Sequence, residues 1–389
     1  MRRLAVLTLL ATVAGMVAGL QAPTGTRAAD NIQRLSPDDS APAVVGNWSA
    51  GAAMPTARTE VTSALLDGVI YAIGGFRATG GNTDLVEAYN TASDSWSARA
   101  ALPQSLDHAG AAMVGGKVYV VGGYVSFSQG IISSATYEYD PTLNAWTARS
   151  SMPLARAAAA TVALDGIIYV LGGVGPQATI PLAYNPTSDS WTQLAPISAA
   201  REHLTASAVA GKIYLVGGRQ NVTQNVNTAE VYDPTTNTWQ TVTKMPTARG
   251  GLASGALAGG VHVVGGEDLS PGGATFPQHE VYDPVTDSWA SELPLPTPRH
   301  GLTAQVVGEK LYVIGGGPTP GLSVSDVVEI FQLDLVGGVT EPPEEAGTPL
   351  DAPDSSGTST PLVAGVAAAA IAGAVALGGA AWYARRRFG

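Results

Sequence analysis

Six tryptophans in this chain share one spacing to a following pair of glycines. In every case the pair begins 26 residues after the tryptophan. The tryptophans are Trp48, Trp96, Trp146, Trp191, Trp239 and Trp289, and the pairs begin at Gly74, Gly122, Gly172, Gly217, Gly265 and Gly315. Successive tryptophans lie 45 to 50 residues apart, so only the stretch after the glycine pair varies in length. This pattern predicts six equivalent structural units, each with one rigid half and one variable half.

Each unit contains the signals of four short antiparallel strands, named a to d. The segment before the glycine pair is rich in β-branched and aromatic residues, as in Val69–Ile73 and Ile167–Leu171, which favours a strand, b. A tyrosine precedes the next tryptophan by seven residues in five units: Tyr89, Tyr139, Tyr184, Tyr232 and Tyr282. Asp-Pro or Asn-Pro often follows this tyrosine and indicates a turn between strand c, with the tyrosine, and strand d, with the tryptophan.

The glycine pair, the Tyr–Trp spacing and a Pro-x-x-Arg-like step before strand a resemble the kelch repeat. The resemblance covers residues 47–335 and implies an all-β fold, a six-bladed kelch-type β-propeller. The region starts with a lone strand d at Trp48 and ends with a strand c in which Phe331 takes the tyrosine position. We therefore predict that the N-terminal strand closes the ring beside the Phe331 strand.

An arginine follows the tryptophan by ten residues in five units, and a glutamate often accompanies it. The arginines are Arg58, Arg156, Arg201, Arg249 and Arg299, and the glutamates, two residues before the Tyr position, are Glu87, Glu230, Glu280 and Glu329. The second unit lacks both, with Leu106 and Tyr137, and the third has Arg156 with Leu182. This co-occurrence predicts a structural Arg–Glu contact, because a buried ion pair is costly to halve. The kelch resemblance implies the alternative that these arginines bind a ligand.

Three histidines lie at the start of strand a in alternate units. They are His108, His203 and His300, and Asp107 and Glu202 precede the first two. A metal site needs ligands that converge, and alternate blades lie across the channel from one another, so we predict no metal site and no cofactor. His262 replaces a strand tyrosine and is predicted to be packed.

The sequence contains no motif for nucleophilic or phosphate chemistry. The glycine pairs follow strands, but no helical pattern follows them, so they are not nucleotide loops. The chain has no cysteine, which excludes the cysteine-linked tyrosine of kelch-type copper oxidases. No catalytic residue is therefore predicted.

The variable b–c loops after the glycine pairs are the predicted place for specificity. They carry Phe76 and Arg77, Tyr124 and Phe127, Arg219 and Asn221, and Glu267 and Asp268, with the aromatic residues expected to be exposed. The predicted binding residues are Arg77, Asp107, His108, Phe127, Glu202, His203, Arg219, Asn221, Glu267 and His300. The predicted function is binding of a protein or carbohydrate on the face of the b–c and d–a loops. The alternatives are a sugar-active enzyme, similar to sialic acid mutarotases, and a structural surface module.

The two ends of the chain predict a membrane-anchored protein. Met1-Arg2-Arg3 and an apolar run predict a signal peptide over 1–29, with an N-terminal membrane anchor as the alternative, and an extension follows over 30–46. A flexible stalk rich in Pro, Glu, Ser and Thr is expected over 336–361, and a transmembrane helix over 362–383. Arginines at 385–387 place the tail, 384–389, in the cytoplasm and the propeller outside the cell. The net charge of −11 argues against a nucleic-acid partner.

Overall fold

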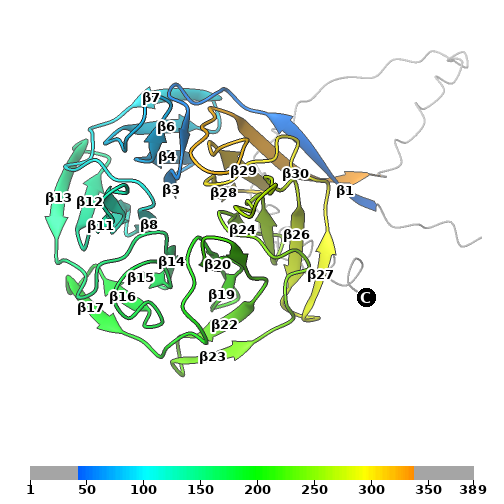
Figure 1. The fold of residues 1–389 in the computed structure, drawn as a ribbon. Helices are drawn as coiled ribbons and strands as arrows, with labels where there is room; N and C mark the ends of the chain where they lie inside the picture. The colour runs from blue at the N-terminus through cyan, green and yellow to red at the C-terminus, as the bar shows by residue number, and fades with distance from the viewer. Residues whose placement is uncertain (1–42, 337–389) are drawn as a thin grey trace, which may run out of the picture. The chain divides into compact units, whose positions relative to one another are not determined.

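A computed structural model describes residues 43–336, which form a ring of six four-stranded antiparallel sheets (Figure 1). These residues contain no α-helix. Each sheet is one blade, and its strands follow one another from the channel outward in the order a, b, c, d. The predicted all-β, six-bladed propeller is confirmed.

The strands occupy equivalent positions in all six blades. The a strands are β3 (Thr62–Leu66), β8 (Gly110–Val114), β14 (Ala160–Leu164), β18 (Thr205–Val209), β24 (Ala253–Leu257) and β28 (Thr303–Val307). The b strands are β4 (Val69–Ile73), β9 (Lys117–Val121), β15 (Ile167–Leu171), β19 (Lys212–Val216), β25 (Gly260–Val264) and β29 (Lys310–Ile314). The c strands are β6 (Val86–Asn90), β12 (Thr136–Asp140), β16 (Leu182–Asn185), β22 (Ala229–Asp233), β26 (His279–Asp283) and β30 (Val328–Val336). The d strands are β7 (Ser95–Ala98), β13 (Ala145–Arg149), β17 (Ser190–Gln193), β23 (Thr238–Thr241), β27 (Ser288–Ser291) and β1 (Ala43–Ala50).

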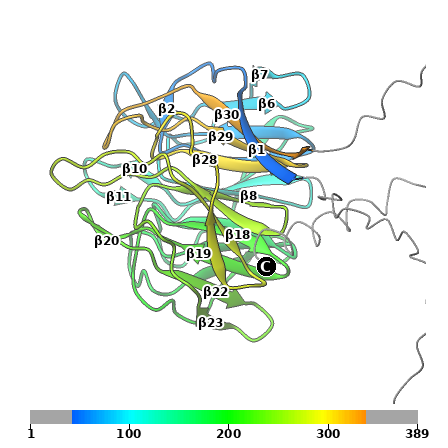
Figure 2. The ribbon, with the colours of Figure 1, turned by 90° about the vertical axis from the view of Figure 1, so that its right-hand side faces the viewer.

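Six further short strands lie in the loops. They are β2 (Arg58–Thr59), β5 (Phe76–Arg77), β10 (Tyr124–Ser126), β11 (Ile131–Ile132), β20 (Arg219–Asn221) and β21 (Gln224–Asn225). The strands β10, β11 and β20 lie toward one side of the ring (Figure 2). This side is formed by the b–c and d–a connections, and we call it the loop face.

The N-terminal strand closes the ring as predicted. β1 pairs antiparallel with β30, and Trp48 lies opposite Phe331 in the ladder. The ladder runs from Ala43 with Val336 to Ala50 with Glu329, slightly beyond the predicted limits of 47 and 335. Because the sixth blade combines both ends of the repeat region, the ring has no open gap between its first and last blades.

The repeated tryptophans join neighbouring blades. Each indole Nε1 donates a hydrogen bond to a backbone oxygen of the preceding blade, four residues after that blade's own tryptophan. The bonds are Trp48 to Leu293, Trp96 to Ala52, Trp146 to Ala100, Trp191 to Ser150, Trp239 to Ala195 and Trp289 to Thr243, at 2.7–3.0 Å. The indole at each strand d therefore fixes the position of its blade relative to the previous one.

The repeated tyrosines fix the turn between strands c and d. The Tyr184 hydroxyl donates to the Asp189 carboxylate at 2.6 Å, and Asp189 also accepts a hydrogen bond from the Ser150 amide of the preceding blade. Asp94, Asn144, Asn237 and Asp287 repeat both contacts, and all five residues have positive φ. Asp and Asn fit here because they tolerate the left-handed conformation and supply the acceptor oxygen.

The Arg–Glu contact predicted from co-occurrence is present in all four blades that carry both residues. Arg58 Nη2 lies 2.7 Å from Glu87, Arg201 Nη1 lies 2.6 Å from Glu230 and Arg299 Nη2 lies 2.8 Å from Glu329, and Arg249 pairs with Glu280. All four guanidinium groups are buried.

The third blade shows how the arginine is kept without its glutamate. Arg156 instead donates to four backbone oxygens, of Ala155, Pro176, Gln177 and Ile180. In the second blade, buried Leu106 replaces the arginine. The buried arginine therefore needs either a glutamate or a set of backbone carbonyls as its partner. Where neither is present, an apolar side chain takes its place.

The glycine pairs bring the loop face together. A Cβ atom on Gly74 would lie 2.5 Å from the oxygen of Leu106 in the next blade. One on Gly75 would lie 2.6 Å from the oxygen of Thr59 in the same blade, and both glycines have positive φ. Only glycine permits such close approach. Each pair therefore lets the start of a b–c loop pack against two d–a connections, one of its own blade and one of the next.

The segments predicted at the two ends fall almost wholly outside the described residues. These are the signal peptide, the extension up to residue 42, the stalk after residue 336, the transmembrane helix and the cytoplasmic tail. Residues 43–46 of the predicted extension belong to β1. Within 43–336 no helix has the length and apolarity needed to cross a bilayer.

Candidate functional site

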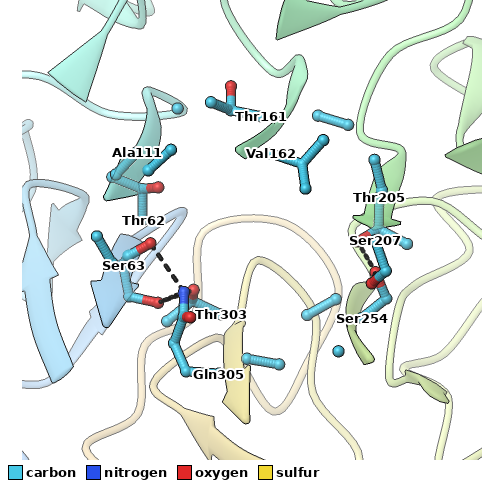
Figure 3. A pocket seen from close by; sticks show the side chains of 18 of the residues that line it. Thr62, Ser63, Ala111, Thr161, Val162, Thr205, Ser207, Ser254, Thr303 and Gln305 are labelled. Carbon is cyan, nitrogen blue, oxygen red and sulfur yellow. Dashed lines mark hydrogen bonds between the residues drawn. The ribbon is translucent and has the colours of Figure 1, made fainter. Parts of the chain in front are cut away.

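The central channel is lined by polar side chains of the a strands. They enclose a cavity of ≈ 400 Å³ whose lining includes Ser63, Thr161, Thr205, Ser207, Ser254, Thr303 and Gln305 (Figure 3). Gln305 donates to Ser63, and Ser63 and Thr303 hydroxyls lie 2.5 Å apart. The described residues that line this cavity therefore offer hydroxyl groups and one amide but no charged group.

A ring of six residues forms the mouth of the channel at the loop face. Each lies 12 residues after a repeat tryptophan and has positive φ; they are Glu60, His108, Ala158, His203, Gly251 and Gly301. From His108 onward, the amide of each donates to the carbonyl of the ring residue in the preceding blade at 2.9–3.2 Å. These mouth-ring residues line a smaller cavity of ≈ 100 Å³. The ring is held by main-chain bonds, so its side chains are free to differ.

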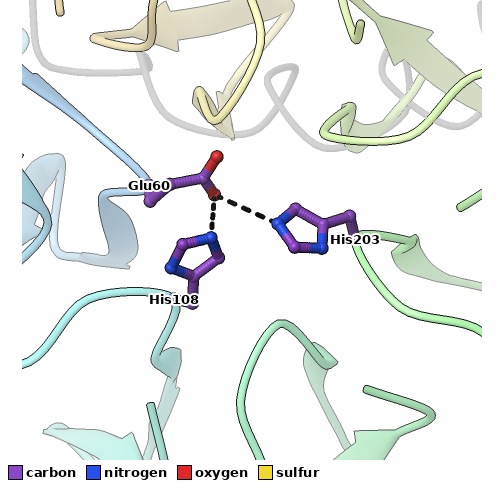
Figure 4. A group of neighbouring side chains, drawn as sticks. All are labelled: Glu60, His108 and His203. Carbon is purple, nitrogen blue, oxygen red and sulfur yellow. Dashed lines mark ion pairs between the residues drawn. The ribbon is translucent and has the colours of Figure 1, made fainter. Parts of the chain in front are cut away.

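Glu60 stands at the centre of a cluster of imidazoles (Figure 4). Its Oε2 lies 3.3 Å from His108 Nε2 and 4.0 Å from His203 Nε2, and its Oε1 lies 3.5 Å from His300 Nδ1. The three histidines are buried. One carboxylate therefore faces imidazoles from the second, fourth and sixth blades.

The carboxylates that precede two of these histidines bind the far side of their rings. His108 Nδ1 lies 2.5 Å from Asp107 Oδ1, and His203 Nδ1 lies 2.9 Å from Glu202 Oε2. Each ring thus has its Nδ1 held by its sequence neighbour and its Nε2 directed at Glu60. The sequence pairs Asp-His and Glu-His consequently act as oriented units.

Arg219 extends the cluster to the fifth blade. Its Nε lies 2.9 Å from Glu202 and its Nη1 lies 2.9 Å from Glu267. Glu267 Oε2 in turn lies 3.4 Å from His300 Nδ1 and accepts a hydrogen bond from the Gly321 amide. The cluster therefore holds four carboxylates, those of Glu60, Asp107, Glu202 and Glu267, around one guanidinium group.

Burial and mutual charge shift the pKa values of these groups in opposite directions. Burial opposes ionisation of Glu60, but His108, His300 and His203 outweigh it and lower its pKa. Burial also opposes protonation of His108, yet Glu60 and Asp107 raise its pKa, and Glu60 and Glu267 raise that of His300. For His203 burial prevails and the pKa is lowered. The cluster thus combines an ionised carboxylate with imidazoles of differing basicity.

Aromatic side chains cover the outer side of His108. Phe127 stacks on the imidazole with ring centroids 5.4 Å apart and planes 7° apart, while Phe76 and Tyr124 contact it edge-on. The expectation that all three aromatic residues are exposed is wrong: Phe76 and Tyr124 are buried against His108, and Phe127 alone is 43% exposed. A single phenyl face is therefore available beside the charged cluster.

The structure gathers eight of the ten predicted binding residues at the channel mouth. They are Asp107, His108, Phe127, Glu202, His203, Arg219, Glu267 and His300. Arg77 and Asn221 are exposed elsewhere on the loop face, and Asn221 donates to Gln224 in its own turn. His262, predicted to be packed, is fully buried on β25, with Nδ1 2.9 Å from His279.

The argument that alternate blades keep the histidines apart is wrong. The mouth ring is narrow, and its left-handed backbone brings side chains of alternate blades within reach of one glutamate. Glu60 itself was not predicted. Its signal was its position, 12 residues after Trp48, as His108 is after Trp96 and His203 is after Trp191.

Comparison with known proteins identifies the family. The KLHDC2/KLHL20/DRC7 Kelch-repeats domain matches residues 111–317, and the Kelch motif matches residues 57–103. None of the curated proteins matches the chain. The structure of YjhT has the same fold, with a TM-score of 0.63 and 18% identity over 73% of this chain and 100% of that one. Because a kelch-repeat domain matches more than half of the residues of this chain, the chain belongs to the kelch-repeat family of β-propellers.

Proposed function

We propose that the channel mouth on the loop face binds a carbohydrate. The observation that carries the proposal is the convergence of charged donors and acceptors from five blades beside one exposed phenyl ring. Sugars are recognised by such a combination, because their hydroxyls exchange hydrogen bonds with charged side chains and their C–H faces pack on an aromatic ring.

The rigid surroundings of the cluster support this proposal. Arg219 is fixed by two carboxylates and His108 and His203 by one each, so little side-chain freedom is lost on binding. The polar channel beneath extends the set of hydroxyl partners. A flat protein-binding face, by comparison, would present several exposed aromatic anchors, whereas only Phe127 of the three aromatic residues at the mouth is exposed.

A glycan array probed with the full-length protein tests the proposal. Phe127→Ala removes the exposed ring and is expected to weaken binding of the selected glycan at least tenfold. Val222→Ala is the matched control, since Val222 is a 65% exposed apolar residue on the b–c loop of the fourth blade. Absence of any glycan signal, or equal losses in both variants, would contradict the proposal.

An enzymatic role for the same site is the second candidate. The Asp107–His108 and Glu202–His203 pairs place imidazoles and carboxylates side by side, as proton transfer to and from a sugar requires. Interconversion of the anomers of a free acidic sugar is a reaction that needs only such transfers. Magnetisation exchange between anomers of free sialic acid should then accelerate with the protein and slow in His108→Asn, while a rate equal to that of buffer excludes this role.

We also propose that the propeller is displayed at the cell surface on a single membrane span. The support is in the sequence: an apolar run follows a positively charged N-terminus, and the uncharged residues 362–382 precede three arginines. Protease treatment of intact cells should remove the propeller while a C-terminal tag stays protected. Protection of the propeller would contradict this location.

A further inference from the structure

The three side chains of Figure 4 have the composition and arrangement of a metal-binding site. We propose that Glu60, His108 and His203 bind one divalent transition-metal ion, with Zn²⁺ as the best fit. Their ligand atoms, one carboxylate oxygen and two Nε2 atoms, all lie within 4.8 Å of one another. This site goes beyond carbohydrate binding and does not depend on it.

The spacing of the ligand atoms suits a small ion. Zn²⁺ binds nitrogen and oxygen at about 2.0–2.2 Å in tetrahedral geometry, which places neighbouring ligand atoms about 3.4 Å apart. Glu60 Oε2 lies 3.3 Å from His108 Nε2 and 4.0 Å from His203 Nε2. The first distance already matches, and the second requires a shift of roughly half an ångström by the Glu60 side chain.

The outer contacts of the two imidazoles are those of metal-bound histidines. In metal sites, the ring nitrogen that does not bind the ion usually donates to a carboxylate, which fixes the tautomer and the ring orientation. Asp107 and Glu202 hold the Nδ1 atoms of His108 and His203 at 2.5 Å and 2.9 Å, which leaves both Nε2 atoms directed at Glu60. Two such carboxylate–histidine units that face one carboxylate are hard to explain by packing alone.

Charge favours a cation in the same place. Four carboxylates surround one guanidinium group, so the cluster is negative whenever its imidazoles are neutral. His300 Nδ1 lies 3.5 Å from Glu60 Oε1 and 3.4 Å from Glu267 Oε2, on a ring that is fully buried. His300 is therefore placed to supply a further ligand or to bind a metal-held water.

The other half of the mouth ring leaves room for an open coordination position. Ala158, Gly251 and Gly301 carry almost no side chain, and the cavity of ≈ 100 Å³ lies against them. A Cβ atom on Gly301 would lie 2.6 Å from Glu60 Oε1, so glycine here also frees the carboxylate. Two histidines and one carboxylate with an open position favour zinc or a similar ion over Ca²⁺ and Mg²⁺, which prefer oxygen ligands.

Calorimetry with the full-length protein, stripped of metal by a chelator, tests this assignment. Titration with Zn²⁺ is expected to show one ion per chain bound at micromolar concentration or below. His203→Ala should abolish this binding, and Asp107→Asn, which alters only the outer contact of His108, should weaken it about 10- to 100-fold. Val222→Ala, which changes an exposed residue of the loop face, should bind as the wild type does.

Co²⁺ provides a readout that depends on coordination and not only on folding. Visible absorption typical of four-coordinate Co²⁺ should appear with the wild type and disappear in His203→Ala. Failure of the wild type to bind Zn²⁺, unchanged binding in His203→Ala, or preferential binding of Ca²⁺ or Mg²⁺ would overturn the proposal. Glycan arrays repeated on the stripped protein separate the two proposals, since either can fail alone.

Discussion

Two positions of the repeat, only two residues apart, behave in opposite ways. The residue ten positions after the tryptophan points into its blade, and in five of six blades it is a buried arginine bound to a glutamate or to carbonyls. The residue twelve positions after it belongs to the mouth ring, where the six blades carry Glu, His, Ala, His, Gly and Gly. The backbone of the mouth ring is nevertheless alike in every blade, with positive φ throughout.

The difference shows how this propeller separates stability from function. The arginine stabilises its blade through side-chain contacts in the core, so the core restricts which residue can stand at this position. The mouth ring is joined by main-chain hydrogen bonds, so any residue that tolerates the left-handed conformation fits. The side chains at the mouth, and with them the ligand chemistry, can therefore change while the blades and the backbone of the ring stay the same.

The largest expected effect is the loss of one half of a core ion pair. Arg58→Leu leaves Glu87 buried without its cation and should lower the free energy of unfolding by about 3–5 kcal/mol. Chemical denaturation measures this loss. The double variant Arg58→Leu/Glu87→Tyr copies the second blade, with its Leu106 and Tyr137, and should recover more than half of it. A double variant as unstable as the single one would show that the pair is not the cause.

Loss of an indole hydrogen bond should cost less. Trp48→Phe removes the donor to Leu293 that helps to join the first strand to the fifth blade, and should destabilise the protein by about 1–2 kcal/mol. Trp146→Phe removes the equivalent bond, to Ala100, which joins the second blade to the first. Equal losses in thermal unfolding would indicate that closure is no weaker than any other blade contact, and a larger loss for Trp48→Phe would mark closure as the weak point.

Replacement at the mouth ring should change stability little. His203→Ala makes the fourth blade like the third, in which Ala158 has φ of 51°. We expect a change in unfolding free energy within about 1 kcal/mol, together with loss of ligand binding at the mouth. Denaturation and glycan binding, measured on the same sample, check both statements. Destabilisation as large as that of Arg58→Leu would show that the mouth-ring residues determine stability as much as the core arginines do.

The smallest expected effect is a dependence of stability on pH at the c–d turns. Hydrogen bonds from Tyr89 and the Ala52 amide lower the pKa of Asp94, and equivalent bonds lower those of Asp189 and Asp287. A lowered folded-state pKa gives stability that is present above the unfolded pKa of about 3.9 and is lost as pH falls through the folded value. Wild-type melting temperature should therefore fall in this acidic range.

The second and fourth blades supply the control for this pH effect. They carry Asn144 and Asn237 at the same turn, where the amide oxygen makes the same contacts without titrating. In a triple variant with Asp94→Asn, Asp189→Asn and Asp287→Asn, the melting temperature should fall less on acidification than it does in the wild type. Identical acid profiles would assign the pH dependence to other carboxylates.

The sequence alone was sufficient for the frame because the frame is periodic. Six copies of Trp, Gly-Gly and Tyr predict the number of blades, the strand order and the closing strand, and the joint presence or absence of Arg and Glu predicts the ion pair. The residues predicted for binding lie on the b–c and d–a loops, and eight of the ten meet at the channel mouth. Periodicity works here because the same local contacts recur, so each copy repeats the information in the others.

Only the tertiary structure decided how the mouth is built. Glu60, His108 and His203 come from three blades and are 48 and 95 residues apart in the chain, and they share only their position in the repeat, 12 residues after the tryptophan. They meet because the ring closes tightly around its axis and because positive φ at each mouth-ring position turns the side chain inward. The sequence determined the repeating unit, and ring closure determined which of its variable residues share one site.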